Sequence, residues 1–129
     1  MKYYYEQKLK NISFEEAIEK TIAALQEEGF GILTEIDIKA TMKKKLDVDF
    51  YNYKILGACS PEFAYRALQT EDKIGTLLPC NVIVQEKEPR MIEVAAINPM
   101  ASMQSVLNPK ILDVAEDVGH KLEKVIKSL

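Results

Sequence analysis

Lys54–Val84 reads KILGACSPEFAYRALQTEDKIGTLLPCNVIV and holds both cysteines, two of the five prolines and two of the five glycines. Residues 53–58 are rich in aromatic and branched side chains, which favour a strand. Ser60 and Pro61 predict a helix start. Serine caps helices, and the N–H that proline lacks would have no hydrogen-bond partner at the first helical position. Pro79 disfavours a helix before it and predicts that a second strand follows. The segment therefore predicts strand, helix and strand in succession.

The second of these strands begins at Cys80 and is apolar, with little alternation, through Val84. Such an apolar run predicts a strand that is buried on both faces of the sheet. Residues 69–73, which connect the predicted helix to this strand, are polar and predict a hinge.

The two cysteines fall where this segment changes from one element to the next. Cys59 lies one residue before the predicted cap, where a helix dipole lowers the pKa of a thiol, although Glu62 opposes that effect. Cys80 is the first residue of the second strand. We predict a ligand-binding cleft lined by Cys59, Ser60, Cys80 and Asn81. Both cysteines are also candidate metal ligands, and the alternative interpretation is a pair of buried, inert thiols.

Four elements are predicted before this segment. Residues 3–9 are predicted as a strand, and a capping box that begins at Ser13 predicts a helix that ends at Gly29. Residues 30–36 are then predicted as a strand and residues 38–46 as a short helix. Alternation along the strand at residues 30–36 predicts that one face carries Ile32, Thr34 and Ile36.

After the segment, residues 86–90 are a polar turn that leads to a returning strand over Met91–Ile97, so an antiparallel hairpin is predicted. A short helix is predicted within 100–107, and Asn108 with Pro109 predicts the start of the last helix. Apolar residues at steps of four and three in that helix predict a stripe that packs across the sheet. These residues are Ile111, Ala115, Val118, Leu122, Val125 and Leu129.

Four motifs in the chain are similar to those of one family. They are LGACSP at Leu56–Pro61, LLPCNVIV at Leu77–Val84, GFGILTEIDIKATMKKKL at Gly29–Leu46 and AINPMASM at Ala96–Met103. Together they resemble the uncharacterised domain-of-unknown-function family 302 over nearly the whole chain. The chain departs from the family pattern at Ser60, where asparagine is expected, and at Glu88–Pro89, where a glycine-containing turn is usual. The resemblance implies a small α+β fold and implies no activity.

Length and composition indicate a single globular domain over residues 1–129, because this length supplies one proper core. A net charge of −3 with both signs interspersed disfavours a nucleic-acid partner. No apolar run is long enough for a membrane span, and the N-terminal MKYYYEQKLK lacks the apolar core of a signal peptide. We therefore expect a cytoplasmic protein with reduced cysteines and no membrane partner.

The order of the predicted elements indicates an α+β fold with two layers. We expect a mixed or antiparallel sheet of about five strands, with the helices packed mostly on one face. The opposite face is then solvated, joined to a second subunit, or the wall of a pocket.

Three classes of function are compatible with these residues. The first is a non-enzymatic ligand-binding or interaction module that acts as a homodimer, which fits the lack of known catalytic motifs. The second is a metal-binding or redox site at Cys59 and Cys80, where two chains of a dimer can supply four thiolates to one zinc ion. The third is an enzyme that uses carboxylates such as Glu35, Asp37 or Glu93. The expected partner is a small molecule or a metal ion, and no motif indicates an organic cofactor.

Three further features are ambiguous. The lysines of the short helix indicate either an anion site or a solvated helix face. They are Lys39, Lys43, Lys44 and Lys45. Met100 and Met103 indicate either a pocket lining or core packing. His120 lies four residues after Glu116, which indicates a surface pair on the last helix, with a ligand or base role as the alternative.

Overall fold

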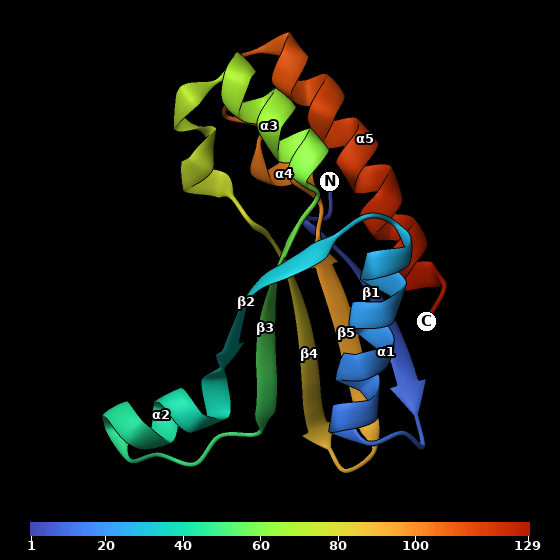
Figure 1. Ribbon diagram of the computed structural model, residues 1–129. Helices are drawn as coiled ribbons and strands as arrows, with labels where there is room; N and C mark the ends of the chain where they lie inside the picture. Colours follow the sequence, from blue (N-terminus) through green and yellow to red (C-terminus); the bar gives the residue numbers. More distant parts are fainter.

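The structure, a computed structural model, describes residues 1–129. The chain forms one five-stranded sheet, five α-helices and one short 3-10 helix (Figure 1). The elements are, in order, β1 Tyr4–Lys10, α1 Phe14–Glu27, β2 Gly31–Asp37, α2 Ile38–Leu46, β3 Asn52–Cys59, α3 Pro61–Thr70, η1 Asp72–Leu77, β4 Cys80–Glu88, β5 Met91–Ile97, α4 Pro99–Ser102 and α5 Pro109–Lys127.

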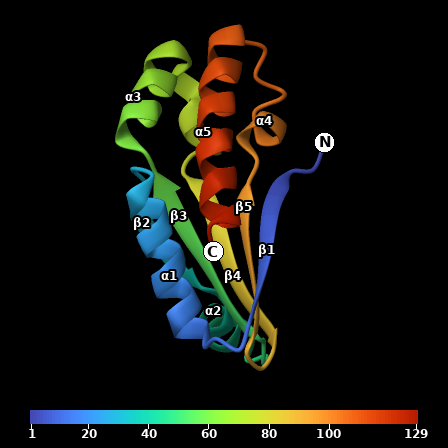
Figure 2. The same ribbon diagram turned by 90° about the vertical axis from the view of Figure 1, so that its right-hand side faces the viewer.

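The sheet has the strand order β1-β5-β4-β3-β2, and every pairing is antiparallel. Helices α1 and α5 lie over one face of this sheet, which is the face turned to the viewer in Figure 2. The predicted α+β fold, with five strands and the helices mostly on one face, is therefore confirmed. Of the two predicted sheet types, the antiparallel one is formed. None of the helices combines the length and the apolar composition that a membrane span needs.

Local side-chain signals set several helix ends as predicted. The Ser13 hydroxyl accepts a hydrogen bond from the Glu16 N–H at 3.1 Å at the start of α1. Gly29 follows the end of that helix with a φ of 86°, a conformation that suits glycine. At the start of α2, the Asp37 carboxylate accepts from the Ala40 N–H at 2.9 Å. Each side-chain cap stabilises its helix by about 1 kcal/mol.

The start of α3 differs from the prediction in one respect. The helix begins at Pro61 as predicted, but the Ser60 side chain makes no capping hydrogen bond, so the predicted side-chain cap is wrong. The Ser60 carbonyl instead accepts the first helical bond from the Ala64 N–H at 2.9 Å. The turn therefore depends on backbone geometry and on the proline, whose missing N–H needs no partner.

The core lies between the sheet and the helices α1 and α5. Helix α5 begins at Pro109, and its predicted apolar stripe is buried from Ile111 to Val125. Leu56 of β3 and Val82 of β4 face each other beneath the helices, and both are fully buried. Burying one such side chain stabilises the fold by about 1.5–3 kcal/mol. Leu129 is only half-buried because it lies beyond the end of the helix.

The prediction that β4 is buried on both faces is wrong. Val82 and Val84 are fully buried, but Asn81 is exposed and Ile83 is only half-buried. The strand therefore has the usual inside–outside alternation, and its second apolar set faces a side of the sheet that α1 and α5 do not cover.

The prediction that Ile32, Thr34 and Ile36 share one face of β2 is also wrong. A β-bulge at Leu33 pairs Ile32 with Ala58 and Thr34 with Gly57, which are neighbours on β3 and point to opposite faces. The bulge also brings the Thr34 hydroxyl against Gly57, where a Cβ atom would overlap this hydroxyl and the Pro79 ring. Gly57 is therefore required by close packing between two strands.

The connection after α3 is more regular than predicted. Residues 69–73 were expected to be a hinge, but α3 continues to Thr70 and η1 covers Asp72–Leu77, with Ile74 buried beneath it. The burial of Ile74 explains the extra order, because it anchors a segment that is otherwise polar. The short helix expected within 100–107 is confined to α4, and Met103 is buried behind it.

Candidate functional site

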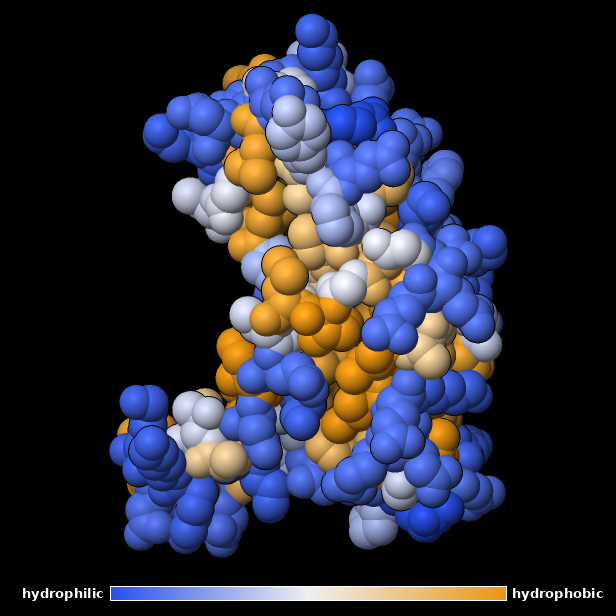
Figure 3. Space-filling view, in the orientation of Figure 1, coloured by the Kyte–Doolittle hydropathy of each residue, from blue (hydrophilic) through white to orange (hydrophobic).

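The face of the sheet away from α1 and α5 is not covered by either helix, and we call it the open face. Apart from Cys59 at the end of β3, the odd-numbered residues of β3, β4 and β5 point toward it, as the pairing of these strands shows. Helix α2 projects at one end of this face and η1 lies at the other (Figure 1). The space-filling view shows that the outline of the molecule is hollowed between them (Figure 3).

The open face contains a hollow of about 410 Å³, which we call the sheet hollow. Its floor is apolar and its rim carries phenol, amide and charged groups, which is the usual composition of a ligand site. The lining residues are Tyr3, Tyr4, Glu6, Tyr53, Asn81, Ile83, Gln85, Lys87, Glu93, Ala95, Ala96 and Ile97.

Aromatic rings continue the sheet hollow toward α2. Phe50 stacks on Tyr51 with ring centroids 4.3 Å apart, and Tyr53 lies about 6 Å from both rings. Gln85 Nε2 donates to the Tyr51 hydroxyl at 3.2 Å, which connects the cluster to β4. Burial raises the pKa of Tyr53, and its neighbour Tyr51 adds to this effect. The Tyr53 phenol is therefore neutral at physiological pH and can both donate and accept hydrogen bonds.

One ion pair lies at the rim of the sheet hollow. Lys87 Nζ is 3.3 Å from a carboxylate oxygen of Glu93. The hydrogen bond to Glu93 raises the pKa of Lys87, and the negative charge of the same carboxylate adds to the effect. Glu6 is the third charged residue of the lining, so two carboxylates and one ammonium give the sheet hollow a net charge of −1.

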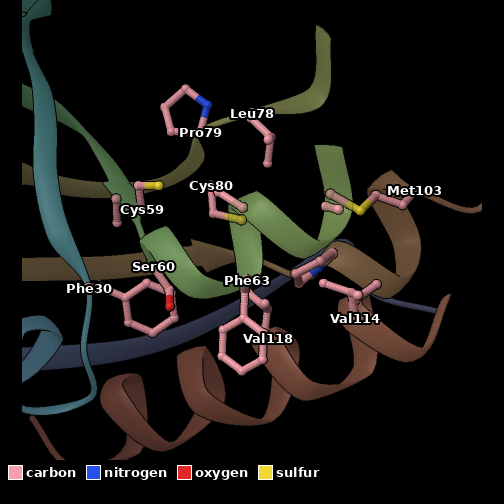
Figure 4. Close-up of a pocket in the computed structure, with 15 residues that line it drawn as sticks. Phe30, Cys59, Ser60, Phe63, Leu78, Pro79, Cys80, Met103, Val114 and Val118 are labelled. Carbon is pink, nitrogen blue, oxygen red and sulfur yellow. The ribbon is translucent and has the colours of Figure 1, made fainter. Parts of the chain in front are cut away.

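The two cysteines line a different and much smaller space, which we call the cysteine cavity. It has a volume of about 40 Å³ and lies between the strand ends and the helices α3 and α5. Figure 4 shows Cys59 and Cys80 on its wall, with Phe63 and Val118 also lining it. Both thiols are free. The cavity is mostly apolar, since twelve of its fifteen lining residues are hydrophobic.

The environment of the cysteine cavity keeps both thiols protonated. Burial raises the pKa of Cys80 to about 11, and the neighbouring Cys59 adds to the shift. Burial also raises the pKa of Cys59. The sequence left open a Cys59 thiol whose pKa is lowered by the helix dipole or a buried, inert thiol, and here desolvation raises the pKa of Cys59. Reactive thiols in proteins generally have a lowered pKa, so neither cysteine has the electrostatics of a poised nucleophile.

The four predicted site residues divide between the two spaces. Cys59, Ser60 and Cys80 line the cysteine cavity, whereas Asn81 lines the sheet hollow on the other side of the sheet. Strand alternation explains the division, because Cys80 and Asn81 are consecutive and point to opposite faces.

The candidate catalytic carboxylates each have a structural partner. Glu35 lies 3.8 Å from Lys54 Nζ, Asp37 caps α2, and Glu93 pairs with Lys87. No group of three or more His, Cys, Asp or Glu side chains is placed to hold a metal ion within this single chain. The only histidine, His120, is exposed on α5.

Sequence reasoning missed most of the sheet hollow. Tyr3, Tyr53 and Gln85 were not predicted as site residues, although Gln85 alternates with the buried Val84 on β4. The alternation was visible in the sequence, but the face that stays uncovered depends on where the helices pack. That packing is not encoded in any local pattern.

Comparisons with known proteins give the same fold. Residues 5–129 match the family described as "Domain of unknown function DUF302". The crystal structure of the uncharacterized conserved protein DUF302 from Bacillus stearothermophilus aligns with a TM-score of 0.89 and 24% sequence identity, over 98% of each chain. No curated protein matches the chain. At this identity the similarity to the crystal structure shows a common fold.

Proposed function

The chain belongs to the DUF302 family of domains of unknown function, and on that premise we propose that it is a non-enzymatic, small-molecule-binding module that acts as a homodimer. The sheet hollow is the binding site. Its size carries this proposal: 410 Å³ falls within the range of about 300–1,000 Å³ typical of ligand pockets. The cysteine cavity of 40 Å³ has room for only a few water molecules.

The lining of the sheet hollow indicates the class of ligand. Tyrosine rings offer flat surfaces for a planar group, and Asn81 and Gln85 offer amide donors and acceptors at its edge. The net charge of −1 favours an uncharged or cationic molecule. We therefore propose a planar heteroaromatic ligand without negative charge. The overall net charge of −3 likewise argues against a nucleic acid as the partner.

The same lining supports binding rather than catalysis. It contains no cysteine, serine or histidine, which are the common nucleophiles and bases. Its Glu93 carboxylate is held in an ion pair with Lys87. Apart from the Glu6 carboxylate, what remains are groups that orient a bound molecule by hydrogen bonds and stacking.

A thermal-shift screen against planar heteroaromatic compounds tests the proposal. A compound that fills the sheet hollow at 100 times its Kd stabilises the protein by about 2.7 kcal/mol, which raises the Tm measurably. We expect the double variant N81A/Q85A to lose this Tm increase, because both amides face the ligand. The matched control is C59A, which alters the cysteine cavity and is expected to keep the increase. Equal binding by N81A/Q85A, or loss of binding in C59A alone, would contradict the proposal.

A thiol-based function is the second candidate, because both cysteines line one cavity at adjacent strand ends. In this alternative the thiols bind a metal ion, with two chains supplying four thiolates, or cycle through a disulfide. The two free thiols also suit a reducing compartment such as the cytoplasm. Zinc retained by natively purified protein, with thiols that react only after chelation, would favour this candidate. Metal-free protein whose thiols react only on denaturation would exclude the metal site.

A further inference from the structure

Helix α2 is the one helix that buries none of its residues. It has nine residues, and isolated helices shorter than about 12–15 residues are marginal in water. The Asp37 cap holds its start, and the Lys39 ammonium donates to the Phe50 carbonyl at 2.7 Å. Beyond these attachments α2 projects away from the sheet, on the side opposite to α1 and α5 (Figures 1 and 2). A short helix in this position would be stabilised by a further packing partner.

Exposed apolar side chains concentrate on α2 and the residues beside it. We call residues 33–48, from β2 through α2 to the following loop, the arm. The arm has sixteen of the 129 residues but four of the eleven large exposed hydrophobic side chains. These are Leu33, Ile36, Leu46 and Val48. These exposed side chains lie along one segment beside an uncovered sheet face, which favours an interaction surface there.

The size of the open face indicates that the arm belongs to the same interface. Five strands at about 4.8 Å and seven residues at about 3.3 Å give a sheet face of about 24 by 23 Å, or roughly 550 Å². Stable interfaces bury about 800 Å² on each partner. The sheet alone falls short of that area, so an interface of this size needs the arm at its end as well.

A second copy of this chain fits this surface better than an unrelated protein. One molecule carries both the projecting arm and the hollowed face, so a single two-fold axis covers both hollows and both arms at once. An unrelated partner would cover only one hollow and one arm, and its surface would have to be complementary to both.

Charge favours an antiparallel arrangement of the two copies. Helix α2 carries four lysines, of which Lys43 pairs with Asp47 at 2.8 Å. The other three lysines form no ion pair, so two arms placed side by side would bring these like charges together. The opposite end of the open face carries Glu71 and Asp72 at the start of η1, and Asp72 pairs with Lys73 at 3.0 Å, which leaves Glu71 as the free acidic group there. The C-terminal end of η1 borders a hollow of about 230 Å³ whose lining includes the apolar Leu77 and Leu78. An antiparallel two-fold brings the basic, leucine-bearing arm to this end of the partner.

We infer that two copies of this chain pair open face to open face, in antiparallel orientation, with the arm of each copy packed against the η1 end of its partner. This arrangement rests on the proposed function, because it closes the sheet hollow from solvent and makes the dimer the binding-competent state. Pairing of the two β2 edges is the competing arrangement. The β-bulge at Leu33 disfavours it, since bulges interrupt regular edge pairing.

Oligomeric state in solution tests the interface. The variant L33E/L46E places charges on two arm side chains that are each 66% exposed, so the fold is expected to stay intact. We expect its dimer Kd to rise by at least about 30-fold in sedimentation equilibrium, the effect of losing one strong interface residue. The matched control L107E alters a leucine that is 95% exposed and outside the arm, and it should dimerise like the wild type. An unchanged Kd in L33E/L46E, or a monomeric wild type, would overturn the inference.

Cross-linking distinguishes the orientation. In a mixture of ¹⁵N-labelled and unlabelled protein, we expect lysine cross-links between chains to join Lys43, Lys44 or Lys45 to Lys73 of η1. Links between the two arms would indicate a parallel dimer or β2 edge pairing and would overturn the inference.

A wild-type dimer that is sensitive to L33E/L46E but binds none of the screened compounds would contradict the proposed ligand while leaving the dimer intact. A monomeric wild type that binds a compound would contradict the dimer while leaving the proposed ligand site intact.

Discussion

At the scale of single residues, adjacent positions have opposite environments. Cys80 points into the packed interior, and Asn81, the next residue, points onto the open face. The sequence motif around them was recognisable, and it correctly placed a strand start at Cys80. It did not reveal that the four predicted site residues would divide between two spaces, because that depends on which side the helices cover.

The buried thiol of Cys80 should make the fold less stable at alkaline pH. Burial raises the pKa of Cys80 from an ordinary 9.0 to about 11, so the folded state binds the proton more tightly than the unfolded state. The stabilisation is therefore complete below pH 9 and is lost as the pH rises to 11. The loss amounts to at most about 3 kcal/mol, at about 1.4 kcal/mol for each pKa unit.

Urea unfolding at several pH values measures this effect. Tyrosines and lysines titrate in the same range, so the informative quantity is the difference between wild type and C80A. We expect the free energy of unfolding of the wild type to fall more steeply with pH than that of C80A. Parallel pH profiles would show that the Cys80 thiol is not desolvated as described.

Gly57 is a position where one added methyl group should disrupt the packing. A Cβ atom there would overlap the Thr34 hydroxyl and the Pro79 ring. We expect G57A to lower the free energy of unfolding by about 1–3 kcal/mol, the usual effect of overpacking. G31A is the matched control, since Gly31 lies on the neighbouring strand with open space around its Cα. Similar unfolding midpoints for G57A and wild type would show that the contact is not tight.

At the scale of elements, two helices with the same kind of apolar periodicity have different environments. The stripe of α5 is buried, whereas α2, with apolar residues one turn apart, buries nothing. Both helices were predicted with correct starts, since caps and prolines act locally. Burial was not predictable in the same way, because it depends on elements distant in the chain. For the same reason the one-sided burial of β4 and the bulge in β2 were missed.

Truncation of the α5 stripe should be costly. Leu122 is fully buried, so we expect L122A to lower the free energy of unfolding by about 2–5 kcal/mol through lost burial and a residual cavity. The control L107A removes the same atoms from an exposed side chain and should change stability by less than about 0.5 kcal/mol. Chemical denaturation of both variants measures the difference. Equal effects would mean that α5 does not form the core.

At the scale of the whole molecule, the helices cover one face of the sheet and leave the other available for binding. The two-layer α+β fold was predictable from the order of elements. The sheet hollow was not, because its residues come from β1, β3, β4 and β5 and from the segment before β1. Only antiparallel pairing brings Tyr3 and Tyr53, fifty residues apart, to the same hollow.

Native mass spectrometry of this chain, purified without denaturation, tests most directly whether the open face is the functional surface. We predict a dimer that carries a non-covalently bound organic molecule, and a monomer without that molecule for L33E/L46E. A wild-type spectrum that contains only bare monomer would contradict both the binding role of the sheet hollow and its closure by a second copy.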